Sequence, residues 1–187
     1  MYKGKGLFNL SEAQLIDSFQ DFLTSLDTLT YGSYFCELID IATEEKESNI
    51  GLFQELVKSL FLMKNKALDI EILARAFEGK VLKYTGYALN FNNCVECGRK
   101  IETSSYISFQ SLGGICNYCN KINGIGVTYA TYNILKYIYE SPLEELYRLS
   151  LDKETKKDIY KILNIIINQN YLKKPKSLQI LNYIKEE

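Results

Sequence analysis

Cys94-Val95-Glu96-Cys97 is followed by a second cysteine pair, Cys116-Asn117-Tyr118-Cys119, and these two stretches decide how the middle of the chain folds. Eighteen residues separate the pairs, a spacing typical of four-cysteine zinc sites. Each pair can form a tight turn that presents two thiolates, and two such turns complete a tetrahedron around one Zn²⁺ ion. Because four thiolates leave no open position for water, we predict one structural zinc ion with the ligands Cys94, Cys97, Cys116 and Cys119.

Paired cysteines also form disulfides and dithiol redox sites. The N-terminal residues Met1-Tyr2-Lys3-Gly4-Lys5-Gly6 lack the apolar middle region of a signal peptide, so we expect a chain in the reducing cytoplasm. Neither cysteine pair follows a buried strand and opens a long helix, as a dithiol redox motif does. A thiol redox enzyme is the weakest hypothesis, and metal content separates it from the others. We interpret the fifth cysteine, Cys36, as a buried apolar side chain among Tyr34, Phe35 and Leu38.

The composition indicates a binding protein and not an enzyme. The 187 residues are 47% hydrophobic, which is enough for one domain with an appendage or for two small domains. No stretch approaches the eighteen apolar residues that a membrane span needs. Histidine is absent, and neither a phosphate-binding glycine loop nor a nucleophile elbow is found. The usual proton shuttle at neutral pH is therefore missing.

The formal net charge of −1 hides a gradient along the chain. Residues 1–47 carry nine acidic and three basic side chains, residues 48–151 carry nine and eleven, and residues 152–187 carry five and eight. A four-thiolate zinc site adds about two further negative charges. Such a chain does not bind nucleic acid through bulk charge, so any contact must be local.

Apolar residues at helical spacing predict helices on both sides of the cysteine pairs. The first helix is expected to begin at Ser11, which forms a capping box with Gln14. Between the cysteine pairs, the alternation in residues 104–109 predicts a short strand. The fold class is therefore mainly α: a helical bundle formed by residues 1–90 and 125–187, with an inserted four-cysteine zinc module at residues 91–124 that contains a short β-hairpin. The predicted helical segments are 11–26, 31–39, 52–61, 70–84, 128–138, 143–147, 152–166 and a last turn or two at 177–183.

The order of these features resembles the RecO family of bacterial recombination mediators, over nearly the whole chain. Of the matching motifs, only the set of four cysteines is specific by itself. The other motifs support the resemblance through their order and spacing along the chain. The matching pieces are Gly6-Leu7-Phe8, Leu73-Ala74-Arg75-Ala76-Phe77-Glu78, Tyr84-Thr85-Gly86-Tyr87, the two cysteine pairs, Phe109, Gly113-Gly114 and Lys176-Ser177-Leu178.

The resemblance implies a protein of the bacterial cytoplasm, associated with the nucleoid during repair, that binds DNA and anneals complementary strands. It also implies action with RecR and single-strand-binding protein to load the recombinase RecA. Family members begin with an oligonucleotide-binding barrel that this chain lacks, so we expect a shortened form or a fragment with weak affinity for single-stranded DNA. The alternative hypothesis is a zinc-stabilised protein-interaction module without direct DNA contact.

Two sets of basic residues are candidates for these contacts. An apolar groove edged by Arg75, Lys80 or Lys83 would suit the acidic C-terminal tail of single-strand-binding protein. We interpret the lysines at positions 153, 156, 157 and 161 as a solvated helix face, with a phosphate-facing patch as the alternative. The candidates for DNA phosphates are Arg99, Lys100, Lys121, Lys173, Lys174 and Lys176.

Overall fold

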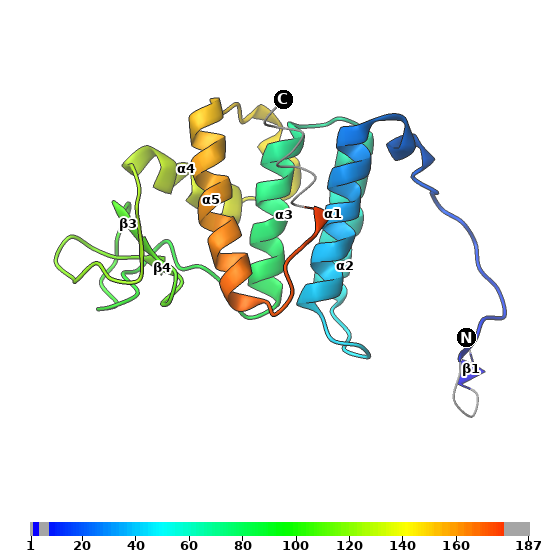
Figure 1. Cartoon of the computed structure of the whole chain (residues 1–187), viewed down its shortest axis with the longest axis horizontal. Coiled ribbons are helices and arrows are strands. Elements are labelled where there is room, and N and C mark those ends of the chain that lie inside the picture. The colour runs from blue at the N-terminus through cyan, green and yellow to red at the C-terminus, as the bar shows by residue number, and fades with distance from the viewer. Residues whose placement is uncertain (1, 4–7, 178–187) are drawn as a thin grey trace.

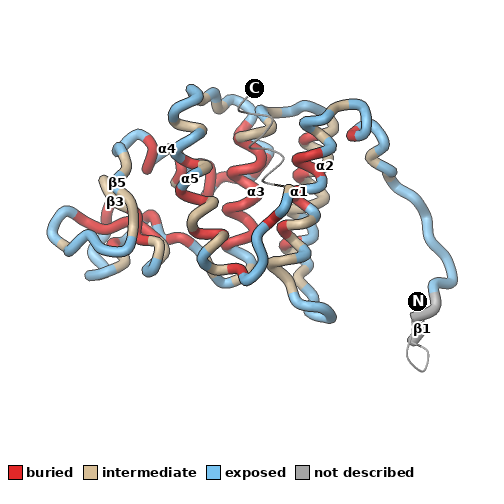
Figure 2. The backbone as a smooth tube through the Cα atoms, in the orientation of Figure 1, coloured by how far each residue is buried: buried red, intermediate tan, exposed pale blue. Residues whose placement is uncertain are grey.

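Helix α3 (Ile70–Tyr84) runs through the centre of this computed structural model, which describes residues 2–3 and 8–177. Every residue of α3 from Ile72 to Leu82 is buried, and the helix appears as a red tube in Figure 2. Other helices pack against it on several sides (Figure 1). These are α1 (Leu26–Ala42), α2 (Ile50–Lys64), α4 (Tyr129–Glu140), α5 (Lys153–Asn170) and the 3-10 helix η2 (Leu143–Arg148).

Short polar side chains begin most of these helices, and two of them, Thr128 and Asp152, lie where the sequence predicts a helix start. Asp69 accepts hydrogen bonds from the amides of the first turn of α3, and Asn49 does the same for α2. Thr128 caps α4 through the amide of Thr131, and Asp152 caps α5. The expected starts of α4 and α5 are therefore confirmed.

The expected helix from Ser11 is wrong, because residues 10–19 are not helical. Leu15 and Ile16 are 77% and 90% exposed, and only Phe19 at the end of the segment packs, against Phe22 and Phe61, which is too little contact to stabilise a short helix. The side chain of Asp17 accepts the amide of Phe19, which takes a left-handed conformation just before the 3-10 helix η1 (Gln20–Thr24). Helix α1 then runs without the break expected before residue 31.

Aromatic side chains fill the bundle core. The rings of Phe35 in α1 and Phe77 in α3 lie 4.5 Å apart between centroids, and Tyr34 and Tyr132 are fully buried. Cys36 does not join them: it lies on the exposed side of α1, so its interpretation as a buried residue is wrong.

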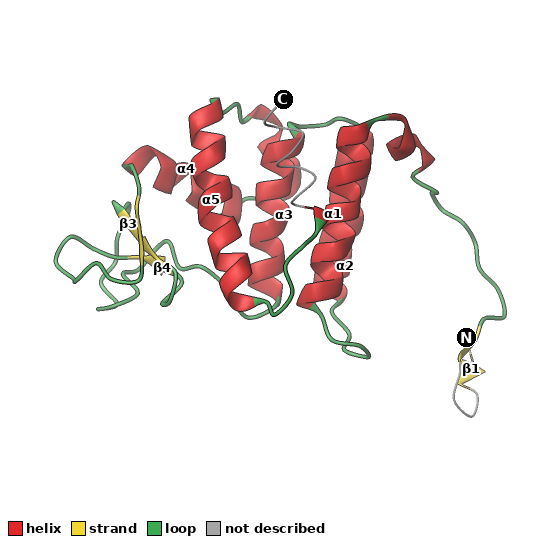
Figure 3. Ribbon diagram, viewed as in Figure 1, coloured by secondary structure: helices red, strands yellow, loops and turns green. Residues whose placement is uncertain are grey.

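The inserted module is a small antiparallel sheet at the end of the bundle beside α4 and α5 (Figure 3). Its strand order is β4 (Gly113–Gly114), β3 (Tyr106–Ser108), β5 (Gly124–Gly126), so a third strand joins the expected hairpin. Strand β5 extends past the boundary expected at residue 124. A side chain at Gly124 would place its Cβ 2.0 Å from the carbonyl oxygen of Ile107, so only glycine lets these strands pair.

Strands β1 (Tyr2–Lys3) and β2 (Phe8–Asn9) pair near the N-terminus, apart from the bundle in Figure 1. The helical turn expected at 177–183 falls, apart from its first residue, outside the described residues. Of the helices within them, none is both long and apolar enough to cross a membrane.

Candidate metal centre

The two cysteine pairs form tight turns, as their sequence predicts. In the first turn, the amide of Gly98 donates to the carbonyl of Cys94 at 2.8 Å, and the amide of Cys94 donates to the carbonyl of Arg99 at 2.8 Å. Gly98 has a φ of 72°, the left-handed conformation that glycine adopts without strain. In the second turn, the amide of Cys119 donates to the carbonyl of Cys116 at 3.3 Å.

Pairing with β4 brings the two turns together. The amide of Val95 donates to the carbonyl of Gly114 at 3.0 Å, and the amide of Cys116 donates to the sulfur of Cys94 at 3.3 Å. The four Sγ atoms then all lie within 4.8 Å of one another, and those of Cys97 and Cys116 are 3.9 Å apart. A tetrahedral zinc site with bonds of about 2.3 Å requires sulfur separations of about 3.8 Å. The arrangement therefore fits one tetrahedral ion.

Hydrogen bonds and crowding move the thiol pKa values in opposite directions. Burial alone would raise the pKa of Cys94, but backbone amides of Cys116, Cys97 and Glu96 donate to its sulfur and lower the pKa to about 6. Hydrogen bonding with the sulfurs of Cys97 and Cys116 raises the pKa of Cys119 to about 12. Four sulfurs this close cannot all ionise unless a cation lies between them, so the cluster is suited to a metal ion.

Cys94 and Cys116 are buried, whereas Cys97 is exposed and Cys119 is intermediate. A metal ion here would be reached from the outside of the module and would hold its two turns together. Four thiolates would complete a tetrahedral shell and leave no position for water, as in structural metal sites. No other group of three or more metal-ligating side chains lies together in the described part of the chain.

Three of the residues predicted to contact DNA lie on the module. The guanidinium of Arg99 stacks over the ring of Tyr118, 4.8 Å from its centroid, and Lys100 is exposed beside it in the chain. Lys121 donates from Nζ to the hydroxyl of Ser105 at 2.9 Å.

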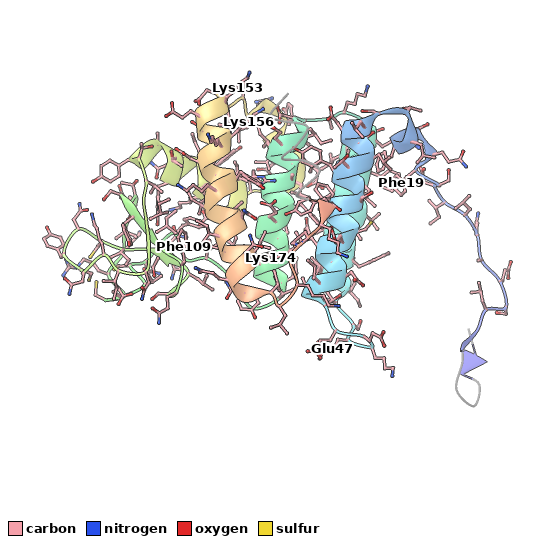
Figure 4. The ribbon with its side chains drawn as sticks, viewed as in Figure 1. Phe19, Glu47, Phe109, Lys153, Lys156 and Lys174 are labelled. Carbon is pink, nitrogen blue, oxygen red and sulfur yellow. The ribbon has the colours of Figure 1, made fainter. Side chains whose placement is uncertain are left out.

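The other three lie beyond the end of α5 (Figure 4 labels Lys174). Lys173 lines an open cavity of about 640 Å³ formed at the ends of α1, α3 and α5. Lys174 and Lys176 are exposed, and the backbone amide of Lys176 donates to Glu37 of α1 at 2.8 Å. No contact among the described residues joins this group to the module.

Tyr118 is a surface residue that our prediction missed. It is 84% exposed, with Arg99 over its ring. Its position inside the second cysteine pair was the available signal, because both flanking cysteines are turned toward the cluster of four sulfurs.

The predicted basic rim of Arg75, Lys80 and Lys83 is not found. Arg75 is buried, pairs with Glu78 at 2.8 Å and lies over the ring of Tyr160 in α5. Lys80 is also buried and donates to backbone carbonyls at the end of α4. These side chains point to different neighbours of α3, and only Lys83 is exposed. Two of the three side chains that we assigned to the rim, Arg75 and Lys80, therefore lie inside the bundle and not at the edge of a surface groove.

Known proteins resemble this chain along its whole length. The family described as "Recombination protein O C terminal" matches residues 23–179. A "DNA repair protein RecO" of Clostridium acetobutylicum is 52% identical over 186 residues, which are 100% of this chain and 75% of the relative. The protein of the same name from Clostridium novyi is 48% identical over 185 residues, 99% of this chain and 72% of the relative. The one from Caldicellulosiruptor bescii is 31% identical over 183 residues, 98% of this chain and 75% of the relative.

Proposed function

Because this chain belongs to the RecO family of DNA repair proteins, we propose that it serves in the bacterial cytoplasm as a recombination mediator without catalytic activity. In this role it binds single-stranded DNA weakly, supports annealing of complementary strands, and docks RecR and single-strand-binding protein so that RecA can be loaded. The observation that carries the proposal is the family match over residues 23–179, together with identities near 50% along the chain.

The metal in this proposal is one Zn²⁺ ion, held by Cys94, Cys97, Cys116 and Cys119. The sulfur separations and the all-thiolate shell support zinc, because zinc accepts four thiolates in a tetrahedron without requiring redox chemistry. Its contribution is to fold the module, which carries Arg99, Lys100 and Lys121 on its surface. Elemental analysis of protein purified under reducing conditions should find about one zinc per chain.

Strand annealing and DNA binding test the mediator role. We expect the full chain to bind a fluorescent oligothymidylate weakly at low salt, to lose affinity steeply as salt rises, and to speed the pairing of complementary strands. Heat-denatured protein and a strand with no complement are the controls. Absence of both binding and annealing at low salt would contradict the proposal.

The alternative function, a protein-interaction module without DNA contact, makes a different prediction in the same assays. Both functions allow a peptide with the sequence of the single-strand-binding protein tail to bind in the micromolar range, about −8 kcal/mol, but the interaction module would leave the anisotropy of the oligonucleotide unchanged. The exposed apolar side chains Leu15, Ile16 and Leu23 near the N-terminus favour some protein contact. Salt-dependent binding of the oligonucleotide separates the two functions, and peptide binding by the same preparation shows that the protein is active.

A further inference from the structure

Three lysines form a row along the solvent side of α5. Lys153, Lys157 and Lys161 are exposed and follow one another every four residues, a rise of about 6 Å each. None of the three makes an ion pair with a described residue, whereas Lys156, on another side of the helix, pairs with Asp69, which caps α3, and with Glu71 in the first turn of α3. Figure 4 labels Lys153 and Lys156 at the start of this helix. The ammonium groups of the row are therefore exposed and make no ion pair with a described residue, although the exposed carboxylates of Glu154 and Asp158 lie on the adjoining face of the helix.

The last lysine of the row borders a cavity between α5 and the cysteine module. The cavity has a volume of about 410 Å³ and is open to solvent on one side. Strand β5 and the start of α4 form one wall, and α5 forms the other. Its lining residues are Ser105, Ile125, Gly126, Val127, Thr128, Asp158, Lys161 and Ile162.

A second ammonium group reaches this cavity from the module. Lys121 donates from Nζ to the hydroxyl of Ser105, which is itself a lining residue, at 2.9 Å. Lys161 on α5 and Lys121 on the module thus flank the same opening from two separate elements. Asp158 is the only carboxylate among the lining residues, so the ammonium groups of Lys161 and Lys121 face a single carboxylate at this opening.

This arrangement favours a chain of phosphates over a single anion. The lysine row leads along α5 into the opening, so a linear polyanion can contact successive ammonium groups. The cavity has the volume of a small-ligand site, which suits a single unpaired base better than a duplex. The lining residues Ile125, Val127 and Ile162 give it an apolar wall against which a base can pack.

We propose that the lysine row of α5 and the adjoining cavity bind the phosphodiester backbone of single-stranded nucleic acid. This inference rests on the proposed function and assigns its DNA contact to a surface. The bundle and the cysteine module each form one side of this cavity. Folding of the module is therefore needed to complete the site.

Charge reversal on the row is the first test. We expect the double variant Lys157→Glu/Lys161→Glu to bind a fluorescent oligothymidylate at least about tenfold more weakly at low salt. The slope of log K against log salt should become shallower by about 1.4, because two phosphate contacts to a single strand are lost. The matched control is Lys46→Glu/Lys66→Glu, which changes the net charge equally at two exposed loop lysines. Far-ultraviolet circular dichroism checks the fold of each variant.

A substitution inside the cavity is the second test. Gly126 lines the opening, and a Cβ there meets only the carbonyl oxygen of Ser105 at 3.9 Å, an ordinary contact. Gly126→Glu places a carboxylate at the opening and should weaken the binding of the oligothymidylate severalfold, whereas the isosteric Gly126→Gln should retain most of it.

The outcomes separate failure of this site from failure of the proposed function. If the unchanged protein binds the oligothymidylate and the Lys157→Glu/Lys161→Glu variant binds as tightly as its control, the proposed site is wrong and the mediator role stands. If the unchanged protein binds no oligonucleotide at low salt, both are wrong. A polyglutamate peptide that competes as well as the oligonucleotide at equal charge would overturn the nucleic-acid assignment in favour of an acidic protein partner.

Discussion

Lys80 shows how a charged side chain can serve the interior of this fold. Its ammonium donates to the carbonyl oxygens of Ser141 at 2.7 Å and Tyr139 at 3.3 Å. These carbonyls lie at the C-terminal end of α4, where the helix dipole and the unpaired carbonyls favour a cation. From the sequence we predicted that Lys80 is a surface base. In the structure its ammonium instead caps the C-terminal end of α4.

Replacing this lysine should destabilise the bundle. Lys80→Met keeps the side-chain length but leaves two buried carbonyls without a donor, which should lower the free energy of unfolding by about 1–3 kcal/mol. Lys161→Met, at an exposed position, should change it by no more than about 0.5 kcal/mol. Urea denaturation followed by circular dichroism measures both. Equal stability of the two variants would mean that the Lys80 ammonium contributes nothing.

Glu37 of α1 makes a pH-dependent contact with Lys176 and Ser177, which follow α5 in the chain. Its carboxylate accepts the amides of Lys176 and Ser177 at 2.8 and 2.9 Å, and the Ser177 hydroxyl at 2.7 Å. Desolvation raises the pKa of Glu37, but these hydrogen bonds, with the charge of Lys176, outweigh it and hold the pKa below the ordinary 4.5. The contact therefore adds stability above about pH 4.5 and loses it as the pH falls through the lowered folded-state pKa.

The matching measurement is hydrogen exchange at the amides of Lys176 and Ser177. After correction for intrinsic exchange rates, protection of these amides should be constant near neutral pH and should fall below about pH 4.5. Glu37→Gln should remove the pH dependence, while protection inside α1 stays unchanged. Protection that falls with pH in the Glu37→Gln protein as well would assign the effect to another group.

At the scale of elements, the module and the helices depend on different forces. The sheet of the module has strands of only two or three residues, so in the proposed function a metal ion at the four cysteines supplies much of its stability. The bundle packs its own apolar faces around α3. Loss of one metal ligand should therefore affect the two parts unequally.

Cys97→Ser tests this division. The variant should lose its metal and become loose over residues 90–125, while helical circular dichroism is largely retained. Cys36→Ser, an exposed cysteine outside the module, is the control and should keep about one zinc per chain. Full zinc content in Cys97→Ser, or disulfide ladders without zinc in the unchanged protein, would contradict the structural-zinc prediction.

Periodicity and spacing predicted most elements because their causes are local. Asp69, Thr128 and Asp152 act on amides a few residues away, and each cysteine turn closes within its own loop. The errors occur where distant contacts decide. Residues after Ser11 lack a surface to pack on, and β5 exists because Gly124 can approach Ile107. The burial of Arg75 could not be predicted either, because its partners include Tyr160, which lies 85 positions further along the chain.

At the scale of the whole molecule, two tyrosines of α4 join the module to the bundle. The hydroxyl of Tyr132 donates to the carbonyl of Phe91 at 3.0 Å, and the hydroxyl of Tyr139 accepts the amide of Leu89 at 2.9 Å. Both bonds are buried and hold the segment that leads from α3 into the first cysteine turn. The Tyr139 ring also packs against Gly79, where a Cβ would lie 2.9 Å from a ring carbon. Unfolding of the module and of the bundle should therefore be coupled in the unchanged protein.

Removing both hydroxyls should uncouple them. The double variant Tyr132→Phe/Tyr139→Phe keeps the rings in the core but leaves the Phe91 carbonyl and the Leu89 amide buried and unpaired, at about 1–3 kcal/mol each. We expect calorimetry of the zinc-bound protein to change from one unfolding transition to two. The lost hydrogen bonds weaken the contact between the module and the bundle, whereas the interior of each part is unchanged. Tyr137→Phe, at an exposed position of the same helix, is the control and should keep one transition. If the double variant still unfolds in one transition at an unchanged temperature, the packing around Tyr139 couples the parts without these hydrogen bonds.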